Sequence, residues 1–297
     1  MKRYILGLTL LALSGVAFGQ EDLMKELESS QTGDVDYAFQ TFKGTRIVNG
    51  HTVETKPKGT LEFIFAHRFG EVNGGLYELF GLDDAYVRYG LDYGITDNLS
   101  ISYGRNSVDK TMDGYAKYKL IRQSKGAKNI PVTVTALGGI AYKGSPKKEN
   151  VPPGFKTIDR LAYVTQLLIA RKFTPSFSLQ LMPSFVHKNA VDQTIEENDQ
   201  LALGFGGRLK VTKSVAITSE YYYRLNVPET NPFKNTLGVG VDIETGGHVF
   251  QIVITNTRGL TERAFITETS GDVLEGDIHL GFNVTRTFQL GGNRDKN

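Results

Sequence analysis

Apolar side chains alternate with polar or small ones from residue 59 onward, in stretches of about ten residues. This period of two is typical of β-strands, whose successive side chains point to opposite faces of a sheet. Twelve stretches show it, with the apolar sets Leu61/Phe63/Phe65, Val87/Tyr89/Leu91/Tyr93, Leu99/Ile101/Tyr103, Ala116/Tyr118/Leu120, Val132/Val134, Leu161/Tyr163/Leu167/Ile169, Phe177/Leu179/Leu181/Phe185, Leu201/Leu203/Phe205/Leu209, Val215/Ile217/Tyr221/Tyr223, Leu237/Val239/Val241/Ile243, Phe250/Ile252/Ile254 and Ile278/Leu280/Phe282/Val284. The pattern predicts an all-β fold with an even number of strands.

The connections between these stretches alternate in length. Short turns are expected around Asp97-Asn98, Thr174-Pro175, Thr212-Lys213 and Gly246-Gly247, and a moderately short one over residues 124–129. Longer loops lie between them, over residues 70–83, 105–112, 142–157, 188–198, 225–235 and 257–275. Barrels of outer membranes have short periplasmic turns and longer outer loops. The prediction is a closed antiparallel transmembrane β-barrel of about 12 strands over residues 59–290, with both chain ends in the periplasm.

A periplasmic β-sandwich is the alternative, since it also alternates apolar and polar residues, but it would not sort its loops by length. Aromatic residues favour the barrel, because two belts of them are expected at the two membrane interfaces. The predicted periplasmic belt is Tyr93, Phe173, Phe177 and Phe288, and the outer belt is Tyr163, Phe185, Tyr221 and Tyr223.

The first 19 residues have the features of a secretory signal peptide. Lys2 and Arg3 precede an apolar run over residues 4–18, which ends in small residues. The run is shorter than the roughly 20 residues of a spanning helix, which disfavours the alternative of an uncleaved anchor. We expect cleavage near Gly19 and a final location in the cell outer membrane.

Residues 20–58 differ from the rest of the chain and are expected to form an N-terminal periplasmic segment. Residues 21–30 are predicted to form a short amphipathic helix, and Asn49-Gly50 is a strong turn signal. The second half of the segment could form a hairpin, a plug or a periplasmic cap. Residues 291–297 are expected to form a polar C-terminal tail.

Composition excludes several classes of protein. The chain has no cysteine, which excludes disulfides, a lipoprotein anchor and thiolate chemistry. Lys and Arg number 34 against 32 Asp and Glu, and become equal when Lys2 and Arg3 are removed, so no net charge indicates nucleic acid. The five histidines show no metal-ligand spacing, and no cofactor is expected. The expected partners are outer-membrane lipid, lipopolysaccharide and the barrel-assembly machinery, with the oligomeric state left open.

The face of the predicted strands opposite the apolar sets carries charges of both signs. In a barrel these side chains would face the lumen, where paired or hydrated charges are tolerated. They are Glu62, Arg68, Arg88, Asp92, Lys117, Lys119, Gln166, Arg208, Lys210, Glu220, Arg224, Asp242, Glu244, His279 and Asn283. The mixture indicates either a narrow channel with little ion selectivity or a lumen closed by ion pairs.

Four of these residues form the candidate constriction. Glu220 and Arg224 share a face of one predicted strand, and Asp242 and Glu244 share a face of the next. Opposite charges on neighbouring strands can pair across them. The sequence therefore predicts a cross-strand cluster that narrows the lumen.

A catalytic site is not expected. A barrel that hydrolyses lipids would need a serine and a histidine near the outer rim, and Ser184, His187 and Asn189 lie close together in the sequence. Ser184 and His187 differ in parity, however, so they point to opposite faces of the strand. The sequence favours a non-enzymatic protein.

Some segments resemble a known family. They are residues 41–55 (TFKGTRIVNGHTVET), 118–123 (YKLIRQ), 246–257 (GGHVFQIVITNT) and 264–269 (AFITET). Together they resemble the outer-membrane barrels of Bacteroidota-type bacteria that are catalogued as domain of unknown function 5777. The resemblance covers most of residues 40–290 and implies a membrane barrel, without implying an activity.

Two functions are compatible with these observations. The favoured one is an integral outer-membrane barrel that acts as a narrow passive pore for small polar solutes. The alternative is a structural or accessory component of the outer membrane that transports nothing, and a barrel lipid hydrolase is disfavoured.

Overall fold

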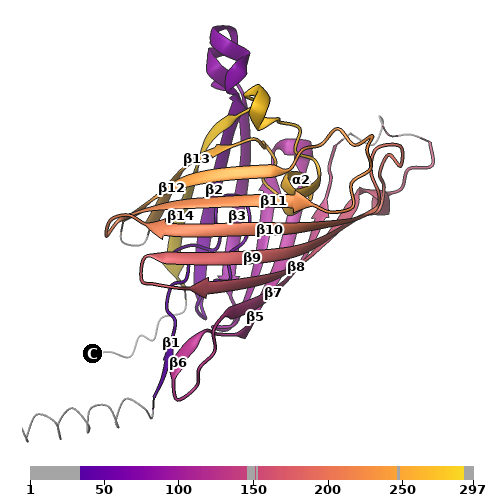
Figure 1. The fold of residues 1–297 in the computed structure, drawn as a ribbon. Coiled ribbons are helices and arrows are strands. Elements are labelled where there is room, and N and C mark those ends of the chain that lie inside the picture. Colours follow the sequence, from indigo (N-terminus) through magenta and orange to yellow (C-terminus); the bar gives the residue numbers. More distant parts are fainter. Residues whose placement is uncertain (1–33, 146–150, 152, 246–247, 291–297) are drawn as a thin grey trace, which may run out of the picture. The chain divides into compact units, whose positions relative to one another are not determined.

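Twelve antiparallel strands close into a barrel in the computed structural model, which describes residues 34–145, 151, 153–245 and 248–290 (Figure 1). Neighbours along the chain pair in the order β2-β3-β4-β5-β7-β8-β9-β10-β11-β12-β13-β14, and β14 closes the ring on β2. The strands are β2 (Thr60–Glu71), β3 (Ala85–Gly94), β4 (Leu99–Asn106), β5 (Met112–Ile121), β7 (Thr133–Tyr142), β8 (Leu161–Lys172), β9 (Phe177–Lys188), β10 (Asp199–Lys210), β11 (Val215–Arg224), β12 (Thr236–Thr245), β13 (His248–Thr255) and β14 (His279–Gln289). The predicted 12-stranded closed barrel is confirmed.

Side chains alternate between the two faces of each strand, as the period of two requires. In β12, Val239 and Val241 are 39% and 36% exposed on the outer surface, whereas Asp242 is 6% exposed and faces inward. Of the eight aromatic residues expected at the two rims, Tyr93 is half-buried and the other seven are exposed. The outer surface is therefore apolar with aromatic residues, and the inner face carries polar side chains together with a buried apolar group that includes Leu168, Met182 and Val253.

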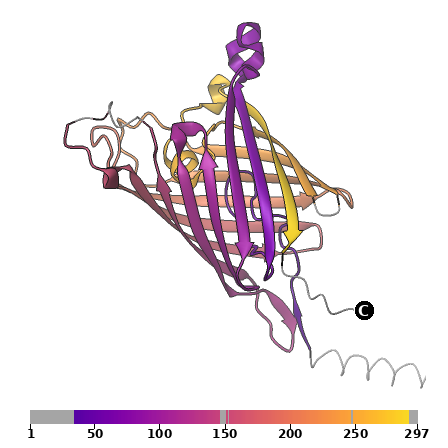
Figure 2. The same ribbon diagram turned by 180° about the vertical axis from the view of Figure 1, so that it is seen from behind.

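The two ends of the barrel differ in the length of their connections. At the short-turn end, β3 and β4, β8 and β9, and β10 and β11 are joined by four residues each at 95–98, 173–176 and 211–214. At the long-loop end, the connections contain the 3₁₀ segments η1 (Val72–Gly81), η2 (Val108–Lys110), η4 (Thr157–Arg160) and η5 (Val273–Glu275) and the helix α2 (Glu262–Thr267). The β2–β3 connection with η1 extends well beyond the strands (Figure 2). No helix in the described part of the chain is long and apolar enough to cross a membrane.

A small separate unit contains residues 34–39 and 123–131. Its two strands, β1 (Val35–Tyr37) and β6 (Ser124–Gly126), pair antiparallel, with Asp36 opposite Lys125. The stretch 124–129, expected to be a turn between two barrel strands, therefore contains a strand of its own.

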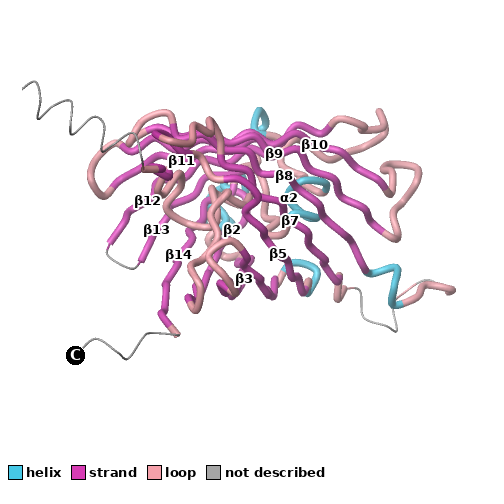
Figure 3. The backbone as a smooth tube through the Cα atoms, turned by 90° about the horizontal axis from the view of Figure 1, so that it is seen from below, coloured by secondary structure: helices cyan, strands magenta, loops and turns pink. Residues whose placement is uncertain are grey.

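Two segments outside the strands lie within the barrel. Residues 41–56, which we name the luminal hairpin, are buried or half-buried, and Phe42, Ile47 and Val53 pack with inward-facing residues of the strands. All six residues of α2, in the connection between β13 and β14, are also buried, and the helix lies inside the ring of strands (Figure 3). The unit that contains the barrel thus begins at Gln40, whereas its first strand begins at Thr60.

Several sequence-based expectations lie outside the described residues. These are the signal peptide over residues 1–19, the helix over residues 21–30, the turn at Gly246-Gly247 and the tail over residues 291–297.

Candidate functional site

The luminal hairpin is a two-stranded turn inserted into the barrel from its short-turn end. Arg46 and His51 form an antiparallel bridge, and the Ile47 N–H donates to the Gly50 carbonyl at 2.8 Å. The base of the hairpin is fixed at the rim, where the Thr55 hydroxyl donates to the Asp97 carbonyl in the β3–β4 turn at 2.8 Å. Its tip thus lies deep in the lumen.

Glu220 of β11 binds the tip of the hairpin through the backbone. Its carboxylate accepts the N–H groups of Val48, Asn49 and Gly50 at 3.1, 2.8 and 2.9 Å. Successive backbone N–H groups in a turn form a concave anion site. Hydrogen bonds to an ionised acceptor are stronger than neutral ones and offset the cost of burying the carboxylate. One side chain therefore satisfies three donors of a turn that has no strand partner there.

Side chains of other strands bind further polar groups of the hairpin backbone. Gln180 of β9 accepts from the Val53 N–H at 2.8 Å and donates to the His51 carbonyl at 2.7 Å. Further donors to hairpin carbonyls are Gln251 to Ile47 at 2.6 Å, Asn283 to Val48 at 2.9 Å, Thr135 to Val53 at 2.8 Å, and Lys117 to Thr52 and Glu54 at 3.2 and 2.6 Å. The polar wall and the hairpin backbone are therefore complementary.

Glycine residues of the wall make room for the apolar side chains of the hairpin. A Cβ at Gly206 of β10 would overlap Ile47, and one at Gly238 of β12 would lie 3.3 Å from the Cβ of Val48. In the hairpin itself, a Cβ at Gly50 would overlap the hydroxyl of Tyr222, which is fully buried. The small size of glycine at these positions therefore lets the hairpin lie close to the wall.

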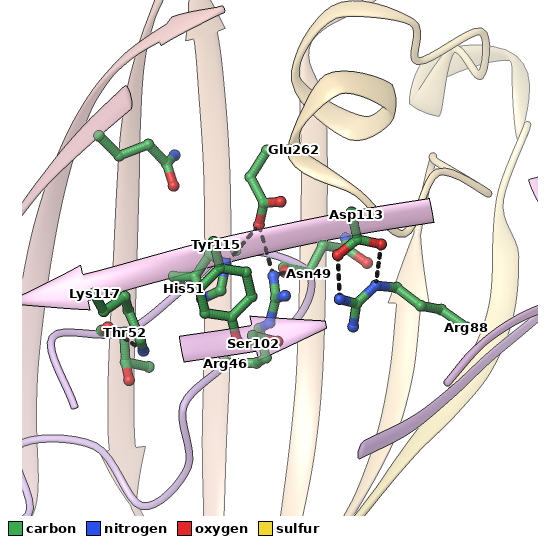
Figure 4. Close-up of polar contacts among 12 residues, drawn as sticks. Arg46, Asn49, His51, Thr52, Arg88, Ser102, Asp113, Tyr115, Lys117 and Glu262 are labelled. Carbon is green, nitrogen blue, oxygen red and sulfur yellow. Dashed lines mark hydrogen bonds and ion pairs between the residues drawn. The ribbon is translucent and has the colours of Figure 1, made fainter. Parts of the chain in front are cut away.

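A charged contact joins the hairpin to α2. Arg46 Nη1 donates to Glu262 Oε1 at 2.6 Å, and His51 Nε2 lies 2.9 Å from the same oxygen (Figure 4). We name Arg46, His51 and Glu262 the luminal clasp. Because Glu262 is brought in by the loop after β13, the clasp connects segments that enter the lumen from opposite ends.

The clasp keeps a defined charge state at neutral pH. Burial and the neighbouring Arg46 lower the pKa of His51 to about 3, so the imidazole is neutral at pH 7. Burial alone would raise the pKa of Glu262, but Arg46 holds it well below its usual range. The clasp is therefore a buried Arg–Glu pair with a neutral histidine beside it.

A second polar cluster lies beside the clasp on β3, β4 and β5. Arg88 forms a two-point ion pair with Asp113 (Figure 4). Asp92 accepts hydrogen bonds from Ser102 at 2.6 Å and from Tyr115 at 2.5 Å. A further aromatic contact ties it to the hairpin, since the Tyr115 ring centroid is 4.1 Å from that of His51.

Little open space remains around the hairpin on the side of β2, β3 and β12–β14. The cavity there has a volume of about 40 Å³, which holds a few water molecules. In the described conformation the hairpin thus occupies most of the space on this side of the lumen.

Of the four residues predicted to form a constriction, Glu220 and Asp242 both face the lumen but are not paired. Glu220 lies opposite Gly238, whereas Asp242 lies opposite Ala216, several residues nearer the short-turn end. Asp242 instead accepts a hydrogen bond from Gln251 at 2.6 Å.

The other two residues lie at opposite ends of the barrel. Arg224 donates to Asn231 at 3.0 Å near the long-loop end, and Glu244 forms ion pairs with Arg208 and with Lys43 near the short-turn end. Among the described residues no ion pair joins any two of the four. The predicted cross-strand cluster of these four residues is therefore wrong, because the strand register places them at different heights along the barrel.

The residues considered for hydrolysis also remain apart. Ser184 is buried in the lumen, where it donates to the Met182 carbonyl, while His187 lies on the outer surface and contacts Asp199 at 2.6 Å. Within the described ranges, no group of three or more His, Asp or Glu residues is placed to hold a metal ion.

Sequence reasoning missed the clasp and the binding of the hairpin by Glu220. Arg46 and His51 lie outside the alternating stretches, and Glu262 lies in a loop. The one available signal was the resemblance, since two of its segments, residues 41–55 and 264–269, correspond to the hairpin and to most of α2.

These features define a membrane β-barrel protein whose lumen is filled by its own N-terminal hairpin. The chain belongs to the family of membrane-bound β-barrel domains DUF5777, whose profile matches residues 42–288. The match begins inside the luminal hairpin, so the hairpin is part of the family domain.

Solved barrels of similar architecture have very different sequences. KdgM porin is 11% identical, with a TM-score of 0.48, and the similarity covers 77% of this chain and 99% of KdgM. The outer membrane protein Omp33 of Acinetobacter baumannii is 8% identical, with a TM-score of 0.44, covering 78% of this chain and 99% of Omp33. Comparison with curated protein sequences found no match.

Proposed function

We propose that the protein is a narrow passive pore for small polar solutes in a bacterial outer membrane, closed in the described conformation by the luminal hairpin. The observation that carries the proposal is that the wall of the lumen and the segment that fills it are separate parts of the chain. The wall belongs to the closed barrel and carries polar side chains beside an apolar group that includes Leu168, Met182 and Val253, whereas the segment that fills the lumen is a separate hairpin. Moving the hairpin would leave a lumen lined by polar side chains.

The size of the barrel supports a pore. Eight strands enclose a space that side chains alone can fill. Twelve strands enclose more, and here the additional space is occupied by main chain. Charges of both signs line the wall, including Glu62, Arg68, Asp92 and Lys117, which suits polar solutes without strong selection for one sign of ion.

A permanently closed accessory barrel is the second candidate. It is favoured by the number of contacts that hold the hairpin, above all the three N–H groups on Glu220 and the buried clasp. The two candidates differ in whether displacing the hairpin lets ions cross the lumen.

Gly50→Ala tests the proposal, because its Cβ would overlap the hydroxyl of the buried Tyr222 and push the hairpin tip away from the wall. In planar bilayers the purified variant should conduct in longer or more frequent openings than the wild type. Gly44→Ala in the same hairpin is the matched control, since a Cβ there has its nearest neighbour at 3.9 Å, and it should behave like the wild type. If all three proteins are folded and silent, the pore is rejected in favour of the accessory barrel.

A further inference from the structure

A cavity of about 460 Å³ lies at the long-loop end of the barrel. We name it the vestibule. It is lined by described residues of the β7–β8 connection (Lys143, Ser145, Phe155, Asp159 and Arg160), by the start of β8, by the end of β9 and the loop after it, and by Arg263 and Glu268. Its volume is in the range of pockets that hold small organic molecules, and it is about ten times larger than the cavity beside the hairpin.

Buried charges of both signs line the vestibule. Lys188 contacts Glu196, and also Glu268 at 3.2 Å, while Arg263 pairs with the same Glu268. The side chains of Lys188 and Arg263 are each 4% exposed, and that of Glu268 is 19% exposed. These charges are therefore held in place and largely removed from solvent, where electrostatic contacts with a ligand are strongest.

The paired charges retain hydrogen-bonding capacity. An ammonium has three donors and a guanidinium five, and a carboxylate has about four acceptor positions. Lys188 and Arg263 make two ion pairs each with described residues, and both ion pairs of Glu268 are made by its Oε1 atom. Donors on the two cations and acceptor positions on the carboxylate thus remain for a ligand.

The rest of the wall combines apolar and charged side chains. Phe155, Ala190 and Val191 are apolar, and Lys143, Asp159, Arg160 and Asp192 add further charges of both signs. The apolar side chains suit an aliphatic body between two charged groups.

We propose that the vestibule binds a small zwitterionic organic solute, with its carboxylate on Lys188 and Arg263 and its ammonium on Glu268. A dianion would meet Glu196 and Glu268 as repelling neighbours, and a dication would meet the two cations. This inference rests on the proposed pore function and names its class of solute, because a molecule bound in the vestibule would stand at the entrance to the lumen.

The position of α2 gives the vestibule a direct connection to the hairpin. Arg263 lines the vestibule, and the adjacent Glu262 holds Arg46 and His51 of the luminal clasp. A solute on Arg263 therefore contacts the same short helix that holds the hairpin.

The test is equilibrium binding to the folded, full-length mature protein in detergent, measured by isothermal titration calorimetry. Four five-carbon probes differ only in their end groups: 5-aminopentanoate, glutarate, cadaverine and 1,5-pentanediol. The zwitterion 5-aminopentanoate should bind more tightly than the other three. Calorimetry measures binding and not conduction. Failure of the vestibule proposal can therefore be distinguished from failure of the pore proposal.

Glu268→Gln removes the acceptor charge for the ammonium and should weaken binding of 5-aminopentanoate by about tenfold or more, as expected for a charge-assisted hydrogen bond. The same variant should gain affinity for glutarate. Glu275→Gln, in η5 and outside the vestibule lining, is the matched control and should bind like the wild type. Circular dichroism should show the same β-structure for both variants.

Three outcomes would overturn the proposal. They are the absence of binding by any probe, binding of glutarate or cadaverine as tight as that of the zwitterion, and a Glu268→Gln variant with unchanged affinity and an intact barrel.

Discussion

Glu220 illustrates how a single buried carboxylate can hold a peptide segment. A carboxylate in a barrel lumen costs free energy unless its oxygens are hydrogen-bonded. Here three consecutive N–H groups of the hairpin supply the bonds. The backbone donors of the turn would likewise be costly to bury alone. The carboxylate and the three N–H groups thus offset each other's cost of burial, so the contact can lie inside the lumen.

At the scale of single residues, the facing of each strand can be tested at the lipid surface. Val241 lies in β12 and is exposed on the outside of the barrel. Val241→Arg should lower the free energy of unfolding by about 2–4 kcal/mol, because the charge would meet the hydrocarbon. Urea-induced unfolding in lipid vesicles measures this change.

The same substitution at the end of the barrel is the control. Val211 lies in the four-residue turn after β10, so Val211→Arg should cost only about 0–1 kcal/mol near the interface. Equal losses at the two positions would contradict the assignment of Val241 to the membrane interior.

At the scale of elements, the conformations of the luminal hairpin and of α2 depend on contacts with the barrel wall. Each is short, and the hairpin has few backbone pairs of its own. Many of its backbone N–H and C=O groups bond to side chains of the strands instead. Such segments have no stable structure outside the barrel, because isolated short hairpins and helices are marginal in water. Their conformation is therefore set by the wall.

A disulfide between the hairpin and β12 should keep the proposed pore closed. A Cβ at Gly238 would lie 3.3 Å from the Cβ of Val48, close to the spacing of about 3.5–4.5 Å in disulfides. The natural chain has no cysteine, so Val48→Cys with Gly238→Cys introduces one defined pair. In planar bilayers the oxidised double variant should show no openings, and reduction should restore them.

The single variants Val48→Cys and Gly238→Cys are the controls, and their conductance should not respond to the reductant. If the oxidised and reduced double variants conduct equally, the hairpin does not close the pore. Mass spectrometry before and after reduction establishes that the bond has formed.

At the scale of the whole molecule, the barrel has two unlike ends. One carries short turns and the base of the luminal hairpin, and the other carries the long loops and the vestibule. In outer-membrane barrels the short turns face the periplasm. The proposed orientation therefore places the vestibule on the cell exterior.

An inserted epitope tests this orientation. A tag between Gly74 and Gly75, in the projecting η1 segment, should be labelled by antibody on intact cells. The same tag between Thr212 and Lys213, in the β10–β11 turn, should be labelled only after the outer membrane is permeabilised. The reverse pattern would show that the vestibule faces the periplasm.

The sequence by itself determined the barrel, the number of its strands and the face on which each side chain lies. These properties follow from local order, because a period of two assigns every residue of a strand to one of two faces. Val241 and Asp242, neighbours in β12, could therefore be placed outside and inside before any contact was known. The alternation of short and long connections is equally local.

Only the tertiary structure decided what fills the lumen. Contacts of the hairpin with Glu220 join residues about 170 positions apart in the chain, and those of the clasp join Arg46 to a residue 216 positions away. No periodicity encodes such pairings. The register between β11 and β12 likewise separated Glu220 from Asp242, since parity gives the face of a residue but not its height along the barrel. The closure of the lumen therefore depends on heights and long-range contacts, which strand periodicity alone cannot supply.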